Sequence, residues 1–200
     1  MQLLLLLCLA AQGQTAEAKK LLDALAPPLK DPSYSQIEFE RGPIKGVIFL
    51  SRSKGWRIDT PGLMLLYDGK AFLDYSKKRN ELRRRDAEPE ELLLRSGGPL
   101  AEIHYSGNAD RLLKDAKQVT VRKEKLNDVD CTHVAVTKKD AVGSEWHIWI
   151  DAAQSCLRAV QKGKNDGKPW EVTWTYKVVD PPTTTEETFT FQPPADAKNK

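Results

Sequence analysis

Short segments in which apolar and polar residues alternate constrain the fold of this chain more than any other feature. The clearest lies between Trp170 and Lys177, where every second residue is aromatic or aliphatic and the residues between them are polar or charged. Side chains of a β-strand alternate between its two faces. This segment therefore predicts a strand with one solvated face and one covered, aromatic face.

Similar segments recur along the chain, separated by turn residues such as Asp68-Gly69. They lie at 34–40, 44–52, 56–58, 63–67 and 71–76, and again at 119–121, 131–137, 145–151, 156–161, 170–177 and 188–191. Short strands spaced about 8 to 12 residues apart and joined by such turns predict an antiparallel meander. The sheet is expected to curve, because open twisted sheets of roughly ten strands usually curl.

Two other regions lack this alternation and predict helices. Within residues 16–29 four leucines are spaced as on one face of a helix, and Pro27-Pro28 would end it. Residues 88–95 and 98–115 are also leucine-rich, with Gly97-Gly98-Pro99 between them. We expect two or three short helices there that cross or plug the sheet. The predicted fold class is α+β, mainly β, with a curved antiparallel sheet.

The N-terminus carries the pattern of an export signal. Leu3 to Ala11 is an apolar run, and small residues follow at Ala16-Glu17-Ala18, as at a cleavage site. The run is too short to span a bilayer, which takes about 20 apolar residues. No Lys or Arg precedes Leu3, so either the true start lies further upstream or the free amino terminus supplies the only positive charge there. We expect a cleaved signal peptide at 1–18, a domain at 19–194, a polar tail at 195–200 and a periplasmic location.

Charge and motifs exclude several classes of function. The net charge is +3, from 31 basic and 28 acidic residues, and no nucleic-acid-binding motif is present, so no nucleic acid partner is expected. There is no nucleophile motif of the G-x-S-x-G type and no phosphate-binding glycine loop. The sequence therefore predicts a protein that is not an enzyme and that uses no cofactor.

His133 and His147 are the strongest candidates for a chemical site, because they would face one another on adjacent strands. Cys131 and Asp151 could supply further ligands to a metal ion. The spacing matches no zinc pattern, so ordinary cross-strand histidines are favoured and no metal is expected.

Two cysteines remain beyond the signal, Cys131 and Cys156. An even pair in an oxidising compartment predicts a disulfide, here one that ties neighbouring strands. The alternative is two separately buried thiols.

A basic run begins at Lys77-Lys78-Arg79 and continues at Arg83-Arg84-Arg85. It could contact anionic lipid head groups or an acidic partner. The favoured alternative is a solvated hairpin whose charge is compensated by the acidic residues between 86 and 91.

Aromatic and aliphatic side chains could either line a cavity for acyl chains or fill an ordinary core. Four of the five tryptophans lie between 146 and 174. The candidate cavity residues are Phe39, Phe49, Trp56, Ile58, Leu65, Tyr67, Leu93, Trp146 and Trp174.

Three segments, Gly46–Arg52, Trp56–Gly62 and Tyr67–Lys70, resemble the LolA family of periplasmic lipoprotein carriers. Cys131-Thr132-His133, Trp146–Asp151 and Phe189–Pro194 are similar to an uncharacterised exported branch of the same superfamily. Ser53 stands where that family has a proline, and Tyr75-Ser76-Lys77 replaces its Tyr-Asp-Pro turn.

The resemblance implies an unclosed half-barrel with short helices covering its concave face. It also implies a hydrophobic hollow for the acyl chains of lipoproteins, and a role for Arg52 as a latch that ties the lid helices to the barrel. We therefore predict a periplasmic lipid- or lipoprotein-binding protein, a carrier or sensor in envelope lipoprotein transport. Its partners would be acyl chains and a membrane-associated protein. The alternative is an exported, non-catalytic protein-interaction module of the same fold with a solid core; an enzyme that uses His133, His147 and Asp151 is the third hypothesis.

Overall fold

The computed structural model describes residues 2–26, 34–85, 88–140 and 143–200, with side chains from Gln12 onward. The chain forms two compact units, each built from two separate stretches. Unit 1 comprises Met1–Ala26 and Asn108–Thr175, and unit 2 comprises Pro27–Gly107 and Tyr176–Lys200. Pro27 and Pro28, the predicted helix end, lie outside the described residues, as do the side chains of the apolar run Leu3–Ala11.

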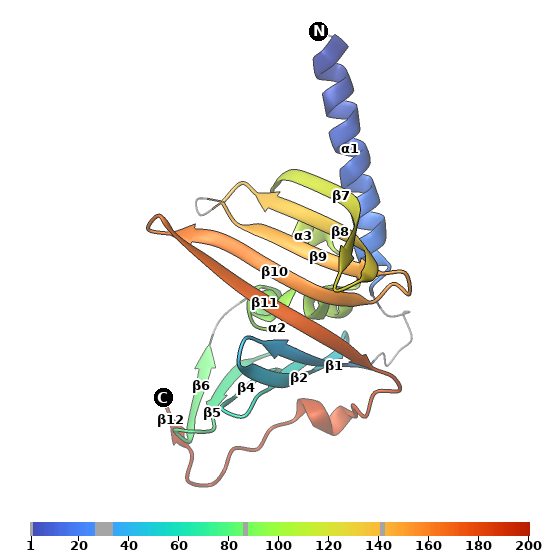
Figure 1. Ribbon diagram of the computed structural model, residues 1–200. Coiled ribbons are helices and arrows are strands. Elements are labelled where there is room, and N and C mark those ends of the chain that lie inside the picture. The colour runs from blue at the N-terminus through green and yellow to red at the C-terminus, as the bar shows by residue number, and fades with distance from the viewer. Residues whose placement is uncertain (1, 27–33, 86–87, 141–142) are drawn as a thin grey trace. The chain divides into compact units, whose positions relative to one another are not determined.

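Unit 2 contains the N-terminal meander that the alternation predicts (Figure 1). Its strands are β1 (Tyr34–Arg41), β2 (Ile44–Ser51), β3 (Gly55–Asp59), β4 (Leu63–Tyr67), β5 (Phe72–Ser76) and β6 (Glu81–Arg85). Each is antiparallel to the next. Strand β6 was not predicted, because three consecutive arginines hide its alternation.

Helix α2 (Pro89–Ser106) packs on β1, β2 and β3. The register places Ile48 opposite both Ile37 and Ile58, so these side chains share the face that meets the helix. Gly97 permits the close approach, because a Cβ there would lie 3.0 Å from Ile48 Cδ1. The helix is kinked at Gly98, whose φ of 78° and ψ of −176° are not helical. The Tyr176 hydroxyl donates to the Gly97 carbonyl oxygen at 3.1 Å, on the N-terminal side of this kink.

Strands β4, β5 and β6 carry a second apolar cluster, on the face opposite to that of Ile58 and Leu65. Its buried members are Met64, Leu66, Leu73, Tyr75 and Leu82. Phe191 and Ala197 from the C-terminal stretch pack against this cluster, and the Tyr75 and Phe191 rings lie 5.1 Å apart. The C-terminal stretch therefore completes the core of unit 2.

The prediction of a closing strand at 188–191 is wrong. A short 3-10 helix, η1 (Glu186–Phe189), occupies this region instead, with a capping box formed by Thr185 and Thr188. These hydroxyls satisfy backbone groups locally, which favours a helical turn over a strand. The added strand comes later: β12 (Lys198–Asn199) pairs in parallel with β6.

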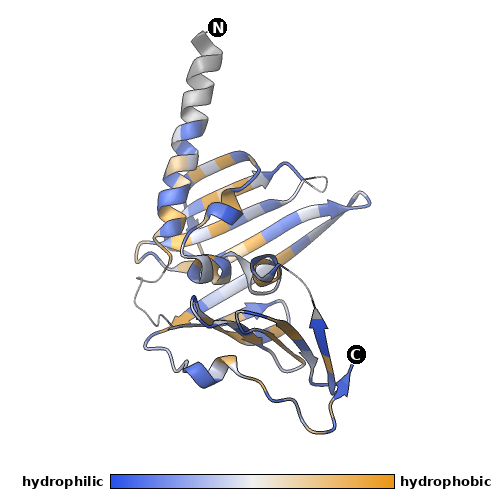
Figure 2. Ribbon diagram, turned by 180° about the vertical axis from the view of Figure 1, so that it is seen from behind, coloured by the Kyte–Doolittle hydropathy of each residue, from blue (hydrophilic) through white to orange (hydrophobic). Residues whose placement is uncertain are grey.

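Unit 1 contains the C-terminal meander. Its strands are β7 (Ala116–Leu126), β8 (Val129–Lys138), β9 (Glu145–Asp151), β10 (Cys156–Asn165) and β11 (Lys168–Val179), whose last residues belong to unit 2. Neighbouring strands are antiparallel, and hydropathy alternates along them (Figure 2). Val134, Ile148, Ala159 and Trp174 are aligned across four strands and are fully buried. The covered face predicted for residues 170–177 is thus fully buried at Trp174, while Trp170, Val172 and Tyr176 are partly buried.

Helix α1 (Gln2–Asp23) packs against β7, and the short α3 (Asp110–Leu113) lies beside it. Ala18 and Leu22 are fully buried, and Lys19 bridges Asp23 and Asp110. The helix begins well before residue 16, the predicted start, because the apolar run is helical as well. None of the helices in the described part of the chain is long and apolar enough to cross a membrane.

The predicted class, mainly β with an unclosed antiparallel sheet and a few helices, is confirmed. Among the described residues β7 and β12 each pair with a single strand, so the strand order does not close on itself. Among the strand pairs whose register is given above for the described residues, β12 and β6 form the one parallel pair.

The predicted disulfide is wrong, and Cys131 and Cys156 are separate buried thiols. Strand β9 lies between them: Cys131 of β8 opposes Asp151, and Cys156 of β10 opposes Ile150. Because consecutive residues of a strand point to opposite faces, the two thiols lie on opposite faces of the sheet. Two strand spacings amount to about 10 Å, beyond the roughly 7 Å that a disulfide can span between Cα atoms.

Candidate functional site

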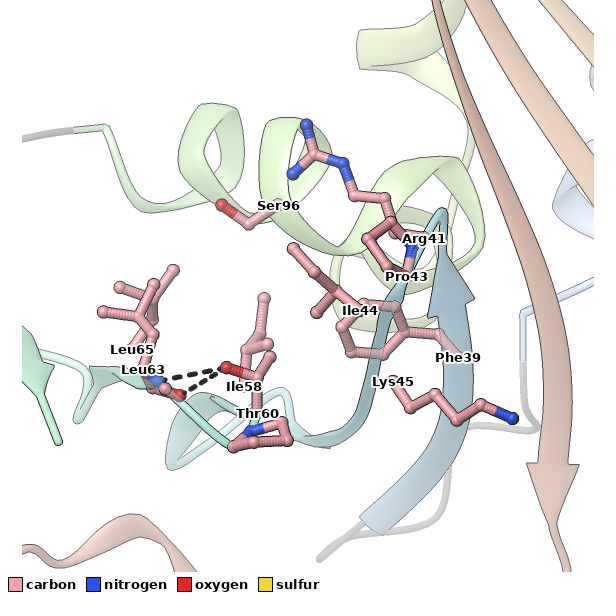
Figure 3. Close-up of a pocket in the computed structure, with 12 residues that line it drawn as sticks. Phe39, Arg41, Pro43, Ile44, Lys45, Ile58, Thr60, Leu63, Leu65 and Ser96 are labelled. Atoms are coloured by element: carbon pink, nitrogen blue, oxygen red, sulfur yellow. Dashed lines mark hydrogen bonds between the residues drawn. The ribbon is translucent and has the colours of Figure 1, made fainter. Parts of the chain in front are cut away.

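Unit 2 contains a pocket of about 390 Å³ between α2, the β1–β2 hairpin and the β3–β4 turn (Figure 3). Most of its lining side chains are apolar. The lining residues are Phe39, Arg41, Pro43, Ile44, Lys45, Ile58, Thr60, Pro61, Gly62, Leu63, Leu65 and Ser96.

The apolar wall follows from the strand register. Ile58 of β3 opposes Leu65 of β4, so both side chains point to the same face. Phe39 of β1 opposes Gly46 of β2, and a Cβ at Gly46 would lie 2.6 Å from Phe39 Cε1. The glycine thus leaves the space that the Phe39 ring occupies beside the pocket.

Hairpins close two ends of the pocket. The Thr60 hydroxyl accepts from the Leu63 amide at 3.1 Å and stabilises the β3–β4 turn, as the dashed lines in Figure 3 show. Ile44, at the start of β2, is 44% exposed, so the pocket has an apolar rim in contact with solvent.

Charged and polar groups lie at more than one side of the pocket, with Arg41 and Ser96 beside α2 and Lys45 and Thr60 at the strands (Figure 3). Arg41 ends β1 and Ser96 belongs to α2, and both are partly buried. Burial lowers the pKa of Arg41, and the positive charge of Arg95 lowers it further, while Tyr176 acts in the opposite direction. Lys45 forms an exposed ion pair with Glu40 at 2.5 Å.

The structure gathers three of the predicted cavity residues, Phe39, Ile58 and Leu65, at this pocket. Trp56 and Leu93 are fully buried in unit 2, and Tyr67 packs on Trp56 with ring centroids 6.3 Å apart. These three side chains are packed within unit 2 and do not line the pocket.

The remaining predicted cavity residues lie elsewhere. Phe49 opposes Gln36 and Arg57, on the other face of the strands from Ile48. Trp146 and Trp174 stack on one another in the core of unit 1, with centroids 5.6 Å apart.

Sequence reasoning missed Arg41, Pro43, Ile44, Leu63 and Ser96 as pocket residues. The signal was present in Arg41-Gly42-Pro43-Ile44, a turn that brings a charge, a ring and an aliphatic chain together. The sequence shows this segment only as a turn between two strands and does not indicate which other residues its side chains contact.

Arg52 lies at the C-terminal end of α2. Its Nε donates to the His104 carbonyl oxygen at 3.4 Å, and a Cβ on Gly107 would lie 2.8 Å from Arg52 Cζ. A cation is favourable at a helix C-terminus, where carbonyl groups lack helical partners. Arg52 therefore binds the end of the helix that covers β1–β3; its role as a latch stays a prediction.

His133 and His147 face one another in unit 1, as predicted, with His133 Nε2 and His147 Nδ1 3.0 Å apart. Arg122 Nε donates to His133 Nδ1 at 3.0 Å, and Trp149 stacks on His133 with centroids 4.6 Å apart. Burial lowers the pKa of His133 to about 4; His147 and Arg122 lower it too, against the charge of Glu124.

Asp151 does not join this pair, since its Oδ1 accepts from the Ser155 amide at 2.8 Å and caps a turn. Across the described ranges no group of three or more His, Cys, Asp or Glu side chains could hold a metal ion.

Part of the basic run is compensated within unit 2 by acids outside the predicted segment 86–91. Lys77 pairs with Asp59 at 2.8 Å, and Arg79 and Arg83 each approach Glu81 at 3.6 Å. Neither of these acids belongs to the run at 86–91.

A family described as predicted periplasmic proteins (DUF2092) matches residues 49–199. No curated protein sequence matches the chain. An uncharacterized conserved protein from Thermus thermophilus is structurally similar, with a TM-score of 0.58 and 13% identity over 92% of this chain and 98% of that one. At this identity the similarity shows a shared fold.

Two further solved structures are less similar. MucB matches with a TM-score of 0.44 and 13% identity, over 92% of this chain and 65% of that one. A DUF1329 family protein from Desulfovibrio piger matches with a TM-score of 0.38 and 13% identity, over 79% of this chain and 88% of that one.

Proposed function

The chain belongs to the DUF2092 family of predicted periplasmic proteins, and from this premise we propose that it is a non-catalytic carrier or sensor that binds an acyl chain of a lipid or lipoprotein in the pocket beside α2. The family description agrees with the periplasmic location expected from the N-terminus. A protein in that compartment meets lipids and lipoproteins of the envelope.

The observation that carries the proposal is the apolar pocket itself. Its volume of about 390 Å³ falls within the range of roughly 300–1,000 Å³ that small-molecule sites occupy. Each CH₂ group of an acyl chain gains about 0.8 kcal/mol when it is buried. A chain that enters between Phe39, Ile58 and Leu65 replaces water against an apolar wall, which supplies the free energy of binding.

The segments that resemble the LolA family support the proposal by their position. Gly46–Arg52 forms most of β2, and Trp56–Gly62 forms β3 and the following turn. The second segment supplies Ile58, Thr60 and Pro61 to the pocket. Arg52 contacts the end of α2, where a latch on a lid helix would act. A carrier role would require α2 to move, and Arg52 would then control the movement.

The proposal is tested by native mass spectrometry of the protein purified from an envelope fraction, and by titration with dansyl-labelled undecanoic acid. We expect a co-purified lipid mass and saturable fluorescence. Leu63→Trp, which fills the pocket, should weaken binding at least about tenfold, a loss of roughly 1.4 kcal/mol.

Val129→Trp is the matched control, since Val129 is 45% exposed on β8 and does not line the pocket. It should bind the dansyl probe like the wild type. Absence of both adduct and saturable binding, in a protein that unfolds cooperatively, would exclude the proposal.

The tightly packed tryptophan pair of unit 1 favours a second function, a protein-interaction module with a solid core. Trp146 and Trp174 are 2% and 0% exposed and stack on one another, so they leave no lining for a ligand between them. If the dansyl probe does not bind and a partner protein co-purifies, this second function is the better one.

A further inference from the structure

We infer that the pocket beside α2 selects a single-chain amphiphile with an anionic head group, a carboxylate or a phosphate, held by Arg41 and Ser96. This inference rests on the proposed function and names the class of ligand for the same site. It has two independent parts, the number of chains and the charge of the head group.

The volume of the pocket limits the number of chains. At about 390 Å³ it lies near the lower end of the range for small-molecule sites. A lipid with two or three acyl chains needs correspondingly more room. With α2 seated on the strands the pocket has no further room on this side, because Ile58 is only 3% exposed and Gly97 lies within contact distance of Ile48.

The side of the pocket beside α2 carries polar groups, whereas the strand side is mostly apolar. Figure 3 shows Arg41 and Ser96 at α2, while Ile58, Leu63 and Leu65 project from the strands below. A ligand that satisfies both sides has an apolar tail and a polar head. A fully apolar ligand would leave the Arg41 guanidinium to be desolvated beside it, which costs free energy.

The charge at the polar side is positive. Arg41 is partly buried and stands near a second cation, Arg95, and both conditions lower its pKa. An anion bound beside the guanidinium would offset both effects. The planar guanidinium can donate two parallel hydrogen bonds to a carboxylate or phosphate, and the Ser96 hydroxyl can add a third.

Lys45 provides the comparison within the same lining. It is also basic, but its side chain is 76% exposed, whereas Arg41 is partly buried. Water screens an exposed charge, so its attraction to a bound anion contributes little. A ligand that recognised positive charge in general would depend on both residues, whereas the proposed head-group site depends on Arg41.

Isothermal titration calorimetry with decanoate, decyl phosphate and decan-1-ol tests the inference on wild type, Arg41→Gln, Arg41→Lys and Lys45→Gln. We expect the wild type to bind at least one of the two anions about tenfold or more tightly than the alcohol. Arg41→Gln should remove this preference, because it lowers the affinity for the anions more than that for decan-1-ol. Arg41→Lys should retain part of the preference, and Lys45→Gln should reduce it less than Arg41→Gln does.

Each outcome decides a separate point. Preference for decanoate assigns a fatty-acid-like head group, and preference for decyl phosphate assigns a lysophospholipid-like one. Equal affinity for the alcohol and both anions overturns the head-group inference and leaves the proposed function intact. A co-purified lipid with two or three chains overturns the single-chain inference. Failure of all three probes to bind contradicts the proposed function itself.

Discussion

Hydrogen bonding in unit 1 determines the tautomer of His133. Arg122 can only donate, so His133 Nδ1 must accept and the ring proton lies on Nε2. That proton is donated to His147 Nδ1. Protonation of His133 would place two donors opposite one another at Nδ1, beside Arg122 and 3.5 Å from Glu124 Oε2.

The stability of the protein is therefore expected to depend on this ring. The folded pKa of His133, about 4, lies below its ordinary value of 6.5, so the unfolded chain binds the proton more readily between these values. As pH falls from 6.5 to 4, the free energy of unfolding should decrease, on the order of 3 kcal/mol from this group. Above pH 6.5 the group has no effect.

Urea unfolding at several pH values between 7.5 and 4 measures this slope. In His133→Gln the same decrease should be smaller, because the titrating ring is gone while a side chain that can accept from Arg122 remains. Identical slopes in the two proteins would refute the assignment.

At the scale of elements, the packing of α2 on the strands depends on Gly97, which has no side chain. A Cβ on Gly97 would lie 2.8 Å from the Ala101 Cβ and 3.0 Å from Ile48 Cδ1. Gly97→Val should lower the free energy of unfolding by about 1–3 kcal/mol, because an overpacked interface must shift. Gly62→Ala is the control, since a Cβ there meets open space. Urea denaturation compares them; equal stability of both variants would mean that α2 does not need the close approach.

The end of α2 allows a test of the latch. Arg52→Gln removes the guanidinium that packs against Gly107 and contacts the His104 carbonyl. We expect a loss of about 1 kcal/mol and faster amide exchange in residues 99–106 than elsewhere in unit 2.

Lys54→Gln, which breaks an exposed ion pair with Glu186, serves as the control and should leave the exchange of α2 unchanged. If Arg52→Gln speeds exchange uniformly across unit 2, Arg52 acts on general stability and is not a latch.

At the scale of the whole molecule, each unit is assembled from stretches that are far apart in the sequence. Unit 2 includes residues that follow Tyr176. Phe191 and Ala197 pack against the second apolar cluster, on β4, β5 and β6, and β12 pairs with β6. Lys200 binds Glu81 at 2.9 Å, and Glu81 is only 11% exposed in its side chain. The C-terminal residues thus belong to the folded core of unit 2.

Truncation after Pro194 removes β12 and Ala197 and should therefore destabilise unit 2. We expect a loss of about 2 kcal/mol in the free energy of unfolding, measured by urea denaturation. Lys200→Gln, which removes only the ion pair, should cost less than about 1 kcal/mol. A truncated protein as stable as the full chain would show that residues 195–200 are dispensable.

The sequence alone determined the local structure, because alternation and turn chemistry act over a few residues. The segments at 44–52 and 63–67 became β2 and β4 within a residue at each end. It also indicated that His133 and His147 lie together, since both stand on strands joined by a short connection. Strand β6 was not predicted, because its three consecutive arginines show no alternation of apolar and polar residues. Its place in the sheet follows from pairing with β5.

Only the tertiary structure decided which distant side chains meet. Cys131 and Cys156 both lie on predicted strands. The sequence does not show the strand register, which puts β9 between the two cysteines and their thiols on opposite faces of the sheet. The pocket likewise joins Arg41, Leu63 and Ser96 from three elements. A periodic pattern specifies which face of an element is apolar, whereas the partner of that face is selected by packing across the whole chain.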